Sequence, residues 1–219
     1  HKVKVVDYVN KLSEEAAVIG SVNTVVNELG KLIGYNTDVN GILDSLIPYK
    51  SQISGNEVCV IGAGGSARAV IYSLIRYFKP QKIYLVNRTD QHAEALKQHF
   101  KSKMKFDGIV TKELQQPDLI TVLKNCSLIV NSTPVGMYPT TDDSVLSSVD
   151  VFVKDQIVFD LVYNPVKTKF LQLAESKNAI TINGLNMLVQ QAAKSFNLWT
   201  GNEFPTEKVY KSLLLYVSK

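Results

Sequence analysis

Short apolar runs alternate along the chain with longer stretches in which apolar residues recur at helical spacing. The short runs are rich in Val, Ile and Leu and predict buried strands at residues 57–61, 82–86, 128–131, 156–161 and 179–182. The longer stretches predict intervening helices at residues 65–78, 90–100 and 166–177. This alternation indicates an α/β fold with a doubly wound parallel sheet, whose ligands bind beyond the carboxyl ends of the strands.

The segments before and after this central part have a different pattern. They predict a helix at residues 2–18, a β-hairpin at 21–37, a helix from Asp38 to about Pro48, and two helices at 185–199 and 206–217. Within the first of these, Ser13 is a candidate start for a new helix. The polar stretch 50–56 is a candidate domain boundary.

The first strand of the central part runs directly into a glycine-rich turn. Gly62 allows a turn that a Cβ would obstruct, Gly64 lets the backbone approach a pyrophosphate, and Ala67 takes the third small position of G-x-G-x-x-A. The helix that follows directs its free N–H groups and positive dipole end at the phosphates. We therefore predict a Rossmann dinucleotide site made by Gly62, Ala63, Gly64, Gly65 and Ser66.

The second central strand ends in Asn87-Arg88-Thr89, which we predict to contact the same cofactor. Sites that prefer NAD usually place an Asp or Glu about 20 residues beyond the glycine turn, where it binds the ribose hydroxyls. Arg88 offers instead a fixed cation that can fork onto a 2′-phosphate. The sequence therefore favours NADP, with a solvated surface arginine as the alternative interpretation of Arg88.

Composition adds limits to this picture. The 219 residues carry a formal net charge of +4 from scattered lysines, which suits an anionic cofactor and substrate but does not indicate nucleic acid. No apolar run is long enough to cross a membrane, and no Cys or His spacing is typical of a metal site. Cys59 and Cys126 are predicted to be buried thiols in a reducing compartment, which we expect to be the cytoplasm. His1, His92 and His99 are all expected at the surface.

Further segments have the residues and the order of known motifs. They are His1-Lys2, Ser21–Thr24, Gly34–Gly41, Gly62–Arg68 with Asn87–Thr89, Asn131–Met137, Asp160–Pro165 and Gly184–Ala192. The third, for example, is similar to G-x-N-T-D-x-x-G, and the fifth to N-x-T-P-x-G-M. Each motif is modest alone, but together and in order they are specific. Along essentially its whole length, the chain resembles the shikimate dehydrogenase family, which includes shikimate/quinate dehydrogenases.

The resemblance implies reversible reduction of 3-dehydroshikimate to shikimate with NADPH. It implies a catalytic pair, Lys2 and Asp38, at a cleft between two domains. Hydride addition to a ring carbonyl leaves an alkoxide that needs a proton and a nearby positive charge, and a lysine ammonium supplies both. Asp38 can hold that ammonium and accept a substrate hydroxyl, and which of the two residues moves the proton is left open. Without the resemblance, Asp38 would be interpreted as a helix N-cap and Lys2 as a surface lysine.

The same resemblance implies further contacts. Asn23, Tyr163 and Gln191, with Asp38, would hydrogen-bond the hydroxyls or carboxylate of the substrate. The nicotinamide would be lined by Thr133, Leu161, Gly184 and Met187, where apolar walls keep water from the hydride path. The alternative interpretations are ordinary structural ones, such as a hairpin asparagine, an exposed helix glutamine and a core methionine.

The resemblance also divides the chain. Residues 1–49 would be the remnant of a substrate-binding catalytic domain, residues 50–183 the NADP-binding Rossmann domain, and residues 184–219 helices that pack back on the catalytic domain. The family's S-x-S segment, which grips the substrate carboxylate, would precede His1, so we expect an N-terminal part of the substrate domain to be missing. The chain as given is then expected to bind NADP better than shikimate, as a monomer or homodimer with small-molecule partners only.

Three other functions are alternatives to this one. A quinate or shikimate dehydrogenase that uses NAD conflicts with Arg88. A regulatory nucleotide-binding module without catalysis fits the missing segment, but it does not explain why both Lys2 and Asp38 are present. Glutamyl-tRNA reductase shares a glycine turn followed by N-R-T, but this chain has no candidate catalytic cysteine outside its predicted core.

Overall fold

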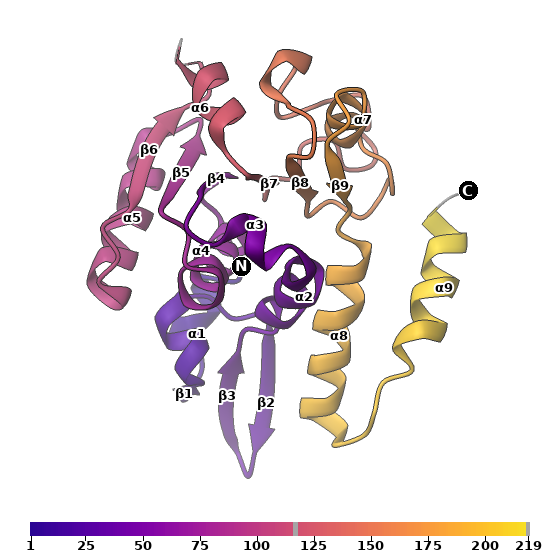
Figure 1. The fold of residues 1–219 in the computed structure, drawn as a ribbon. Coiled ribbons are helices and arrows are strands. Elements are labelled where there is room, and N and C mark those ends of the chain that lie inside the picture. Colours follow the sequence, from indigo (N-terminus) through magenta and orange to yellow (C-terminus); the bar gives the residue numbers. More distant parts are fainter. Residues whose placement is uncertain (116–117, 218–219) are drawn as a thin grey trace.

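The computed structural model describes residues 1–115 and 118–217. It contains a six-stranded sheet in the order β6-β5-β4-β7-β8-β9 and a three-stranded sheet in the order β1-β3-β2 (Figure 1). The large sheet is parallel throughout. The prediction of an α/β fold with a doubly wound parallel sheet and a smaller α/β unit is therefore confirmed.

The strands of the large sheet end at one common edge. They are β4 (Glu57–Ile61), β5 (Lys82–Asn87), β6 (Ile109–Glu113), β7 (Leu128–Asn131), β8 (Ile157–Asp160) and β9 (Ile180–Ile182). Winding proceeds outward from β4 through β5 to β6, and then restarts on the other side of β4 with β7. Ligands of doubly wound sheets bind at this switch point, beyond the carboxyl ends of β4 and β7.

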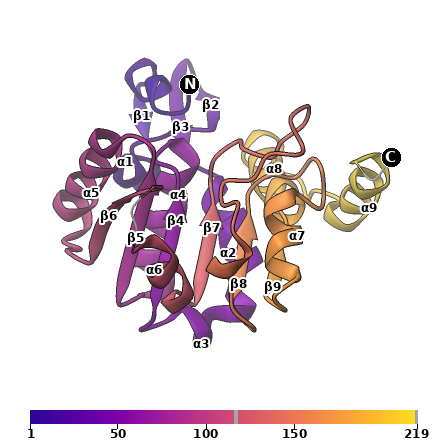
Figure 2. The ribbon, with the colours of Figure 1, turned by 90° about the horizontal axis from the view of Figure 1, so that it is seen from above.

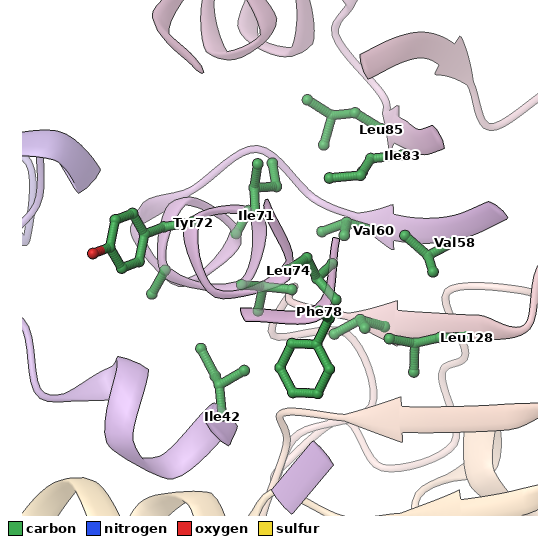
Figure 3. Packing of buried hydrophobic residues seen from close by; sticks show 14 of the residues in the cluster. Ile42, Val58, Val60, Ile71, Tyr72, Leu74, Phe78, Ile83, Leu85 and Leu128 are labelled. Carbon is green, nitrogen blue, oxygen red and sulfur yellow. The ribbon is translucent and has the colours of Figure 1, made fainter. Parts of the chain in front are cut away.

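Helices cover both faces of this sheet. The helices on one face are α2 (Asp38–Leu46), α4 (Gly65–Ser73) and α5 (Asp90–Met104), and those on the other are α6 (Leu119–Asn125) and α7 (Lys169–Glu175) (Figure 2). The pleat explains the division, because Val58 and Val60 point to the first face whereas Cys59 and Ile61 point to the second. Figure 3 shows Val58 and Val60 among Ile71 of α4 and Leu74 and Phe78 of the π-helical turn that follows it, Leu74–Phe78.

The buried thiols expected from the sequence are present. Cys59 is fully buried, and Cys126 is 2% exposed. Burial raises the pKa of the Cys126 thiol to about 12. Among the three histidines, however, the prediction was wrong for His99, which is half-buried with Nε2 2.7 Å from the Val18 carbonyl oxygen. Burial lowers the pKa of His99, because it packs against the end of α1 (Glu14–Ile19).

The small sheet contains β1 (Lys11–Leu12), β2 (Thr24–Glu28) and β3 (Lys31–Tyr35). The hairpin prediction is confirmed, with the turn at Leu29 and Gly30, where φ is 52° and 87°. The prediction of a helix over residues 2–18 was wrong for the part before Ser13. There a short 3₁₀ turn forms at Lys4–Tyr8, and β1 pairs in parallel with the free edge of β3. Ser13 does begin α1, because its Oγ accepts a hydrogen bond from the Ala16 N–H.

Besides β1, one further strand and two helices were not predicted: β6, α6 and α3 (Lys50–Ile53). Strand β6 reads Ile-Val-Thr-Lys-Glu and lies at the edge of the large sheet, so it lacks the continuous apolar run of a central strand. The short helix α3 occupies the polar stretch expected to be a boundary. None of the described helices is long and apolar enough to cross a membrane.

The two helices at the end of the described chain pack differently. Helix α8 (Leu185–Thr200) packs on α2 and contacts β2, and the Trp199 indole N–H donates to the Val25 carbonyl at 3.0 Å. Helix α9 (Thr206–Val217) packs on α8 and lies to the outside of it (Figure 1). Val39, Ile42 and Leu46 of α2 belong to the same apolar cluster as β4 and α4, so α2 and the large sheet share one core.

Candidate active site

A pocket of about 430 Å³ lies at the switch point of the large sheet. It is lined by the glycine turn after β4, the end of β5 and the loop after β7. Of the residues predicted to bind the cofactor, it contains Gly62, Ala63, Gly64, Asn87, Arg88 and Thr133. Ser132, Pro134 and Val135 also line it and were not predicted, although they lie inside the Asn131–Met137 motif.

The glycine turn has the geometry that a dinucleotide needs. Gly62 has a φ of 106°, and a Cβ there would approach Ser132 Oγ to 2.7 Å. A Cβ on Gly64, in contrast, would meet no protein atom within 4 Å among the described residues. The backbone at Gly64 is therefore open to a ligand, and α4 begins directly behind it. These residues fit a bound pyrophosphate.

Arg88 supplies the positive charge of this pocket. Its side chain is exposed, and within residues 1–115 and 118–217 it makes no ion pair. No described Asp or Glu lines the pocket. The neighbouring Asn87 donates from Nδ2 to the Thr89 carbonyl at 2.9 Å, which orders the turn into α5. Thr89 itself does not line the pocket.

A second pocket, of about 340 Å³, is lined by most of the other predicted site residues. Its lining comes from the segment before β2, from the first turns of α2, α4 and α8, and from the loops after β8 and β9. It contains Lys2, Asn23, Asp38, Ser66, Leu161, Tyr163, Gly184, Met187 and Gln191, together with Leu188, which was not predicted. Of all the predicted site residues, only Gly65 and Thr89 line neither pocket.

An ion pair lies at the centre of the second pocket. Lys2 Nζ donates to Asp38 Oδ2 at 2.5 Å, and Asn23 Nδ2 donates to Asp38 Oδ1 at 2.9 Å. Asp38 is 3% exposed, whereas 38% of the Lys2 side chain is accessible. The carboxylate of Asp38 thus contacts an ammonium and an amide rather than capping the helix that it begins. The arrangement can hold a proton donor at a solvent-accessible position.

A buried hydrogen-bond network holds Asn23 and the helix α8 together. The Thr37 N–H donates to Asn23 Oδ1 at 2.8 Å, and Asn23 Nδ2 lies 3.4 Å from Gln191 Oε1. Ser195 Oγ lies 2.7 Å from Thr24 Oγ1 and 3.0 Å from Thr37 Oγ1. These three hydroxyls were not predicted. Ser195 follows Gln191 by one helical turn, which is the sequence signal that could have indicated it.

Lys2 also contacts the glycine-rich helix start. A Cβ on Gly65 would lie 3.0 Å from Lys2 Cβ and 3.3 Å from Lys2 Cδ. The backbone of Lys2 is held as well, because its carbonyl accepts the Val22 N–H at 2.8 Å. The absence of a side chain at Gly65 therefore makes room for the stem of Lys2. Among the described residues, no group of three or more His, Cys, Asp and Glu side chains could hold a metal ion.

Comparisons with known proteins agree with this geometry. The profile of the family described as Shikimate / quinate 5-dehydrogenase matches residues 47–188. The chain belongs to the shikimate dehydrogenase family. A second match, to the shikimate 5′-dehydrogenase C-terminal domain, covers residues 184–214. The resemblance inferred from the motifs is thereby confirmed.

Members of the shikimate dehydrogenase family resemble the chain along its whole length. The shikimate dehydrogenase (NADP(+)) of Chlorobaculum tepidum is 37% identical over 222 residues, an alignment that covers 100% of this chain and 75% of the relative. A crystal structure of a shikimate dehydrogenase in complex with NADP⁺ superposes with a TM-score of 0.90 at 34% identity, and covers 100% of this chain and 75% of that one. A quinate dehydrogenase from Corynebacterium glutamicum in complex with NAD superposes with a TM-score of 0.87 at 29% identity, over 98% and 74% of the two chains.

Proposed function

We propose that this chain catalyses the NADPH-dependent, reversible reduction of 3-dehydroshikimate to shikimate. The observation that carries the proposal is the convergence of Lys2, Asp38, Asn23 and Gln191 on one pocket, while the glycine turn lines another at the same edge of the sheet. Together, the two pockets offer a place for a dinucleotide and a place for a small polar substrate. Membership of the shikimate dehydrogenase family supports this assignment.

The chain's own residues account for the proton transfer. The cofactor would supply a hydride to the carbonyl carbon of the substrate. Lys2 Nζ then donates a proton to the carbonyl oxygen and stabilises its developing negative charge. General acid catalysis of this kind typically accelerates a reaction by roughly 10²- to 10⁴-fold. Asp38 holds Nζ through Oδ2, so the ammonium does not need to be ordered during the reaction.

Other residues of the pocket would recognise the substrate and exclude water. Asn23, Tyr163 and Gln191 carry hydrogen-bonding groups toward it, and 37% of Tyr163 is exposed. Leu161, Met187 and Leu188 give the pocket an apolar side. In this proposal the apolar side faces the reacting ring of the cofactor, where water would compete for hydride.

We assign the preference for NADP to Arg88, because its guanidinium is exposed and makes no ion pair in the described chain. The test is Arg88→Asp, which removes the cation and adds an acceptor for ribose hydroxyls. NADP⁺ affinity should fall and NAD⁺ affinity should rise, as measured by titration calorimetry. Arg76→Asp is the matched control, since Arg76 is exposed in the π-helical turn after α4, Leu74–Phe78, and lines neither pocket. Unchanged NADP⁺ affinity in Arg88→Asp would refute the assignment.

A second candidate is a quinate dehydrogenase that uses NAD, which the similarity to the Corynebacterium glutamicum enzyme favours. The experiment that separates the candidates is the initial rate with each pairing of shikimate or quinate with NADP⁺ or NAD⁺. Fastest turnover of shikimate with NADP⁺ supports the first proposal, and fastest turnover of quinate with NAD⁺ replaces it. Tight NADP⁺ binding without turnover of either substrate would point instead to a regulatory nucleotide-binding module.

A further inference from the structure

We propose that Asp160, which lines neither pocket, is the positioning residue that orders the loops of both. Asp160 is the last residue of β8 and is fully buried. Its neighbour in register on β7 is Asn131, which in turn pairs with Ile61 at the end of the glycine strand β4. Asp160 therefore lies at the carboxyl edge of the sheet, two strands from the glycine turn. The inference rests on the proposed function for the identity of the ligands.

The Asp160 carboxylate accepts hydrogen bonds from three directions. Oδ1 accepts from Asn131 Nδ2 at 2.9 Å and from the Val162 N–H at 3.1 Å. Oδ2 accepts from Thr168 Oγ1 at 2.6 Å. Because a carboxylate can only accept, each of these neighbours must present a donor to it. One side chain thus determines the orientation of groups on three separate segments.

Toward the pocket of about 430 Å³ that contains the glycine turn, the cofactor pocket of the proposed function, the effect passes through Asn131. With Nδ2 directed at Asp160, the Asn131 amide must present Oδ1 to the loop after β7. There Oδ1 accepts from the Thr133 N–H at 3.0 Å and from Thr133 Oγ1 at 2.7 Å. Thr133 Oγ1 then accepts from the Val135 N–H at 3.3 Å. Both Thr133 and Val135 line the cofactor pocket, so the orientation of Asn131 shapes its wall.

Toward the pocket of about 340 Å³ that contains Lys2 and Asp38, the substrate pocket of the proposed function, the effect passes through Val162. Its N–H is held by Asp160, and its carbonyl accepts the Gly184 N–H at 3.0 Å. The residues on either side of it, Leu161 and Tyr163, line the substrate pocket, and so does Gly184. Holding Val162 therefore fixes the direction in which Leu161 and Tyr163 leave the sheet.

The chemistry of the site supports a positioning role over simple packing. Burial raises the pKa of Asp160, and the three hydrogen bonds from Thr168, Val162 and Asn131 oppose that rise. No charge on another described residue is among the causes of the shift, so Asp160 has no ion-pair partner there. A buried carboxylate without a counter-ion is costly. What it offers in return is acceptor capacity for several donors at once, which an apolar residue of the same size lacks.

The test compares Asp160→Ala, which removes every acceptor, with Asp160→Asn, whose carbonyl can still accept from Asn131 and Val162. The matched control is Gln156→Leu, because Gln156 is also buried, precedes the same strand, and bonds the Leu123 and Cys126 carbonyls at the opposite edge of the sheet. Two quantities are measured: amide hydrogen exchange of the ligand-free chain, and the Kd values of NADP⁺ and shikimate.

Asp160→Ala should speed exchange at the Thr133 and Val162 amides and weaken both ligands, each by about tenfold, the effect expected for a lost charge-assisted hydrogen bond. Asp160→Asn should stay within about threefold of the wild type, and Gln156→Leu should change neither quantity. If Asp160→Ala does not fold, Asn131→Ala replaces it, and should speed exchange at Thr133 but not at Val162.

The outcomes separate this inference from the proposed function. Unchanged amide exchange at Thr133 and Val162 in Asp160→Ala overturns the inference. It is also overturned if Gln156→Leu speeds exchange at these two amides as much as Asp160→Ala does. Faster exchange with unchanged Kd values overturns the link from the loops to the pockets. Faster exchange in a chain whose wild type binds neither ligand supports the positioning role and refutes the proposed function instead.

Discussion

The stability of the chain should depend on pH through Asp160. Its pKa is raised from the ordinary value of 3.8 to about 6 by burial. Because the folded state binds this proton more tightly than the unfolded state, the group stabilises the fold below pH 3.8 and loses that contribution as the pH rises through 6. Each pKa unit is worth about 1.4 kcal/mol, so the full change is about 3 kcal/mol, of which about 2 kcal/mol falls between pH 4.5 and 7.5.

The variant that isolates this contribution is Asp160→Asn, since its amide does not titrate. Urea unfolding of the wild type and the variant at pH 4.5 and at pH 7.5 gives the difference in unfolding free energy at each pH, and the other titrating groups cancel. Relative to the wild type, the unfolding free energy of the variant should rise by about 2 kcal/mol from pH 4.5 to pH 7.5. A difference that is the same at both pH values would refute the reasoning, because it would mean that burial does not shift the pKa of Asp160.

Other predictions concern the glycines. Gly65→Ala should lower turnover about tenfold with little change in NADP⁺ affinity, because its Cβ would press on the stem of Lys2, and displacements of well under 1 Å already cost rate. Gly64→Ala should instead weaken NADP⁺ binding with little change in turnover. Equal effects of the two variants, with turnover measured by steady-state kinetics and NADP⁺ affinity by calorimetry, would contradict this division. Gly41→Ala should destabilise the fold by about 1–3 kcal/mol in urea unfolding, because its Cβ would clash with the Met187 backbone carbonyl oxygen where α2 packs on α8. Wild-type stability in that variant would mean that the two helices can separate freely.

Local patterns were sufficient for the central part of the fold. The strand that ends at Ile61, the glycine turn and α4 are adjacent in sequence, so the glycine-turn part of the proposed cofactor pocket is built from residues that are neighbours before folding. Arg88 follows a strand whose apolar run is equally plain. The same locality explains the hairpin and the start of α1 after Ser13. In each case the interactions that form the element come from residues a few positions apart.

Elsewhere the local pattern was misleading or silent. Lys11 and Leu12 lie in a segment with helical spacing, but they pair with β3 because its edge has free N–H and C=O groups nearby. Strand β6 was missed because an edge strand needs no continuous apolar run. His99 looked like a surface residue, and its burial depends on α1 packing beside α5.

The motifs in the sequence determined the family, the class of fold and the residues to examine, because each motif is a short run whose residue types are set by one local task. Only the tertiary structure decided what those residues do together. Asp38 and Gln191 line one pocket because α2 and α8 pack together beside the small sheet, and Lys2 reaches it because its backbone is held by Val22. No spacing along the chain encodes that arrangement. The environment of Asp160 is likewise a property of the assembled sheet, since burial and partners on three segments exist only after β7 and β8 have paired.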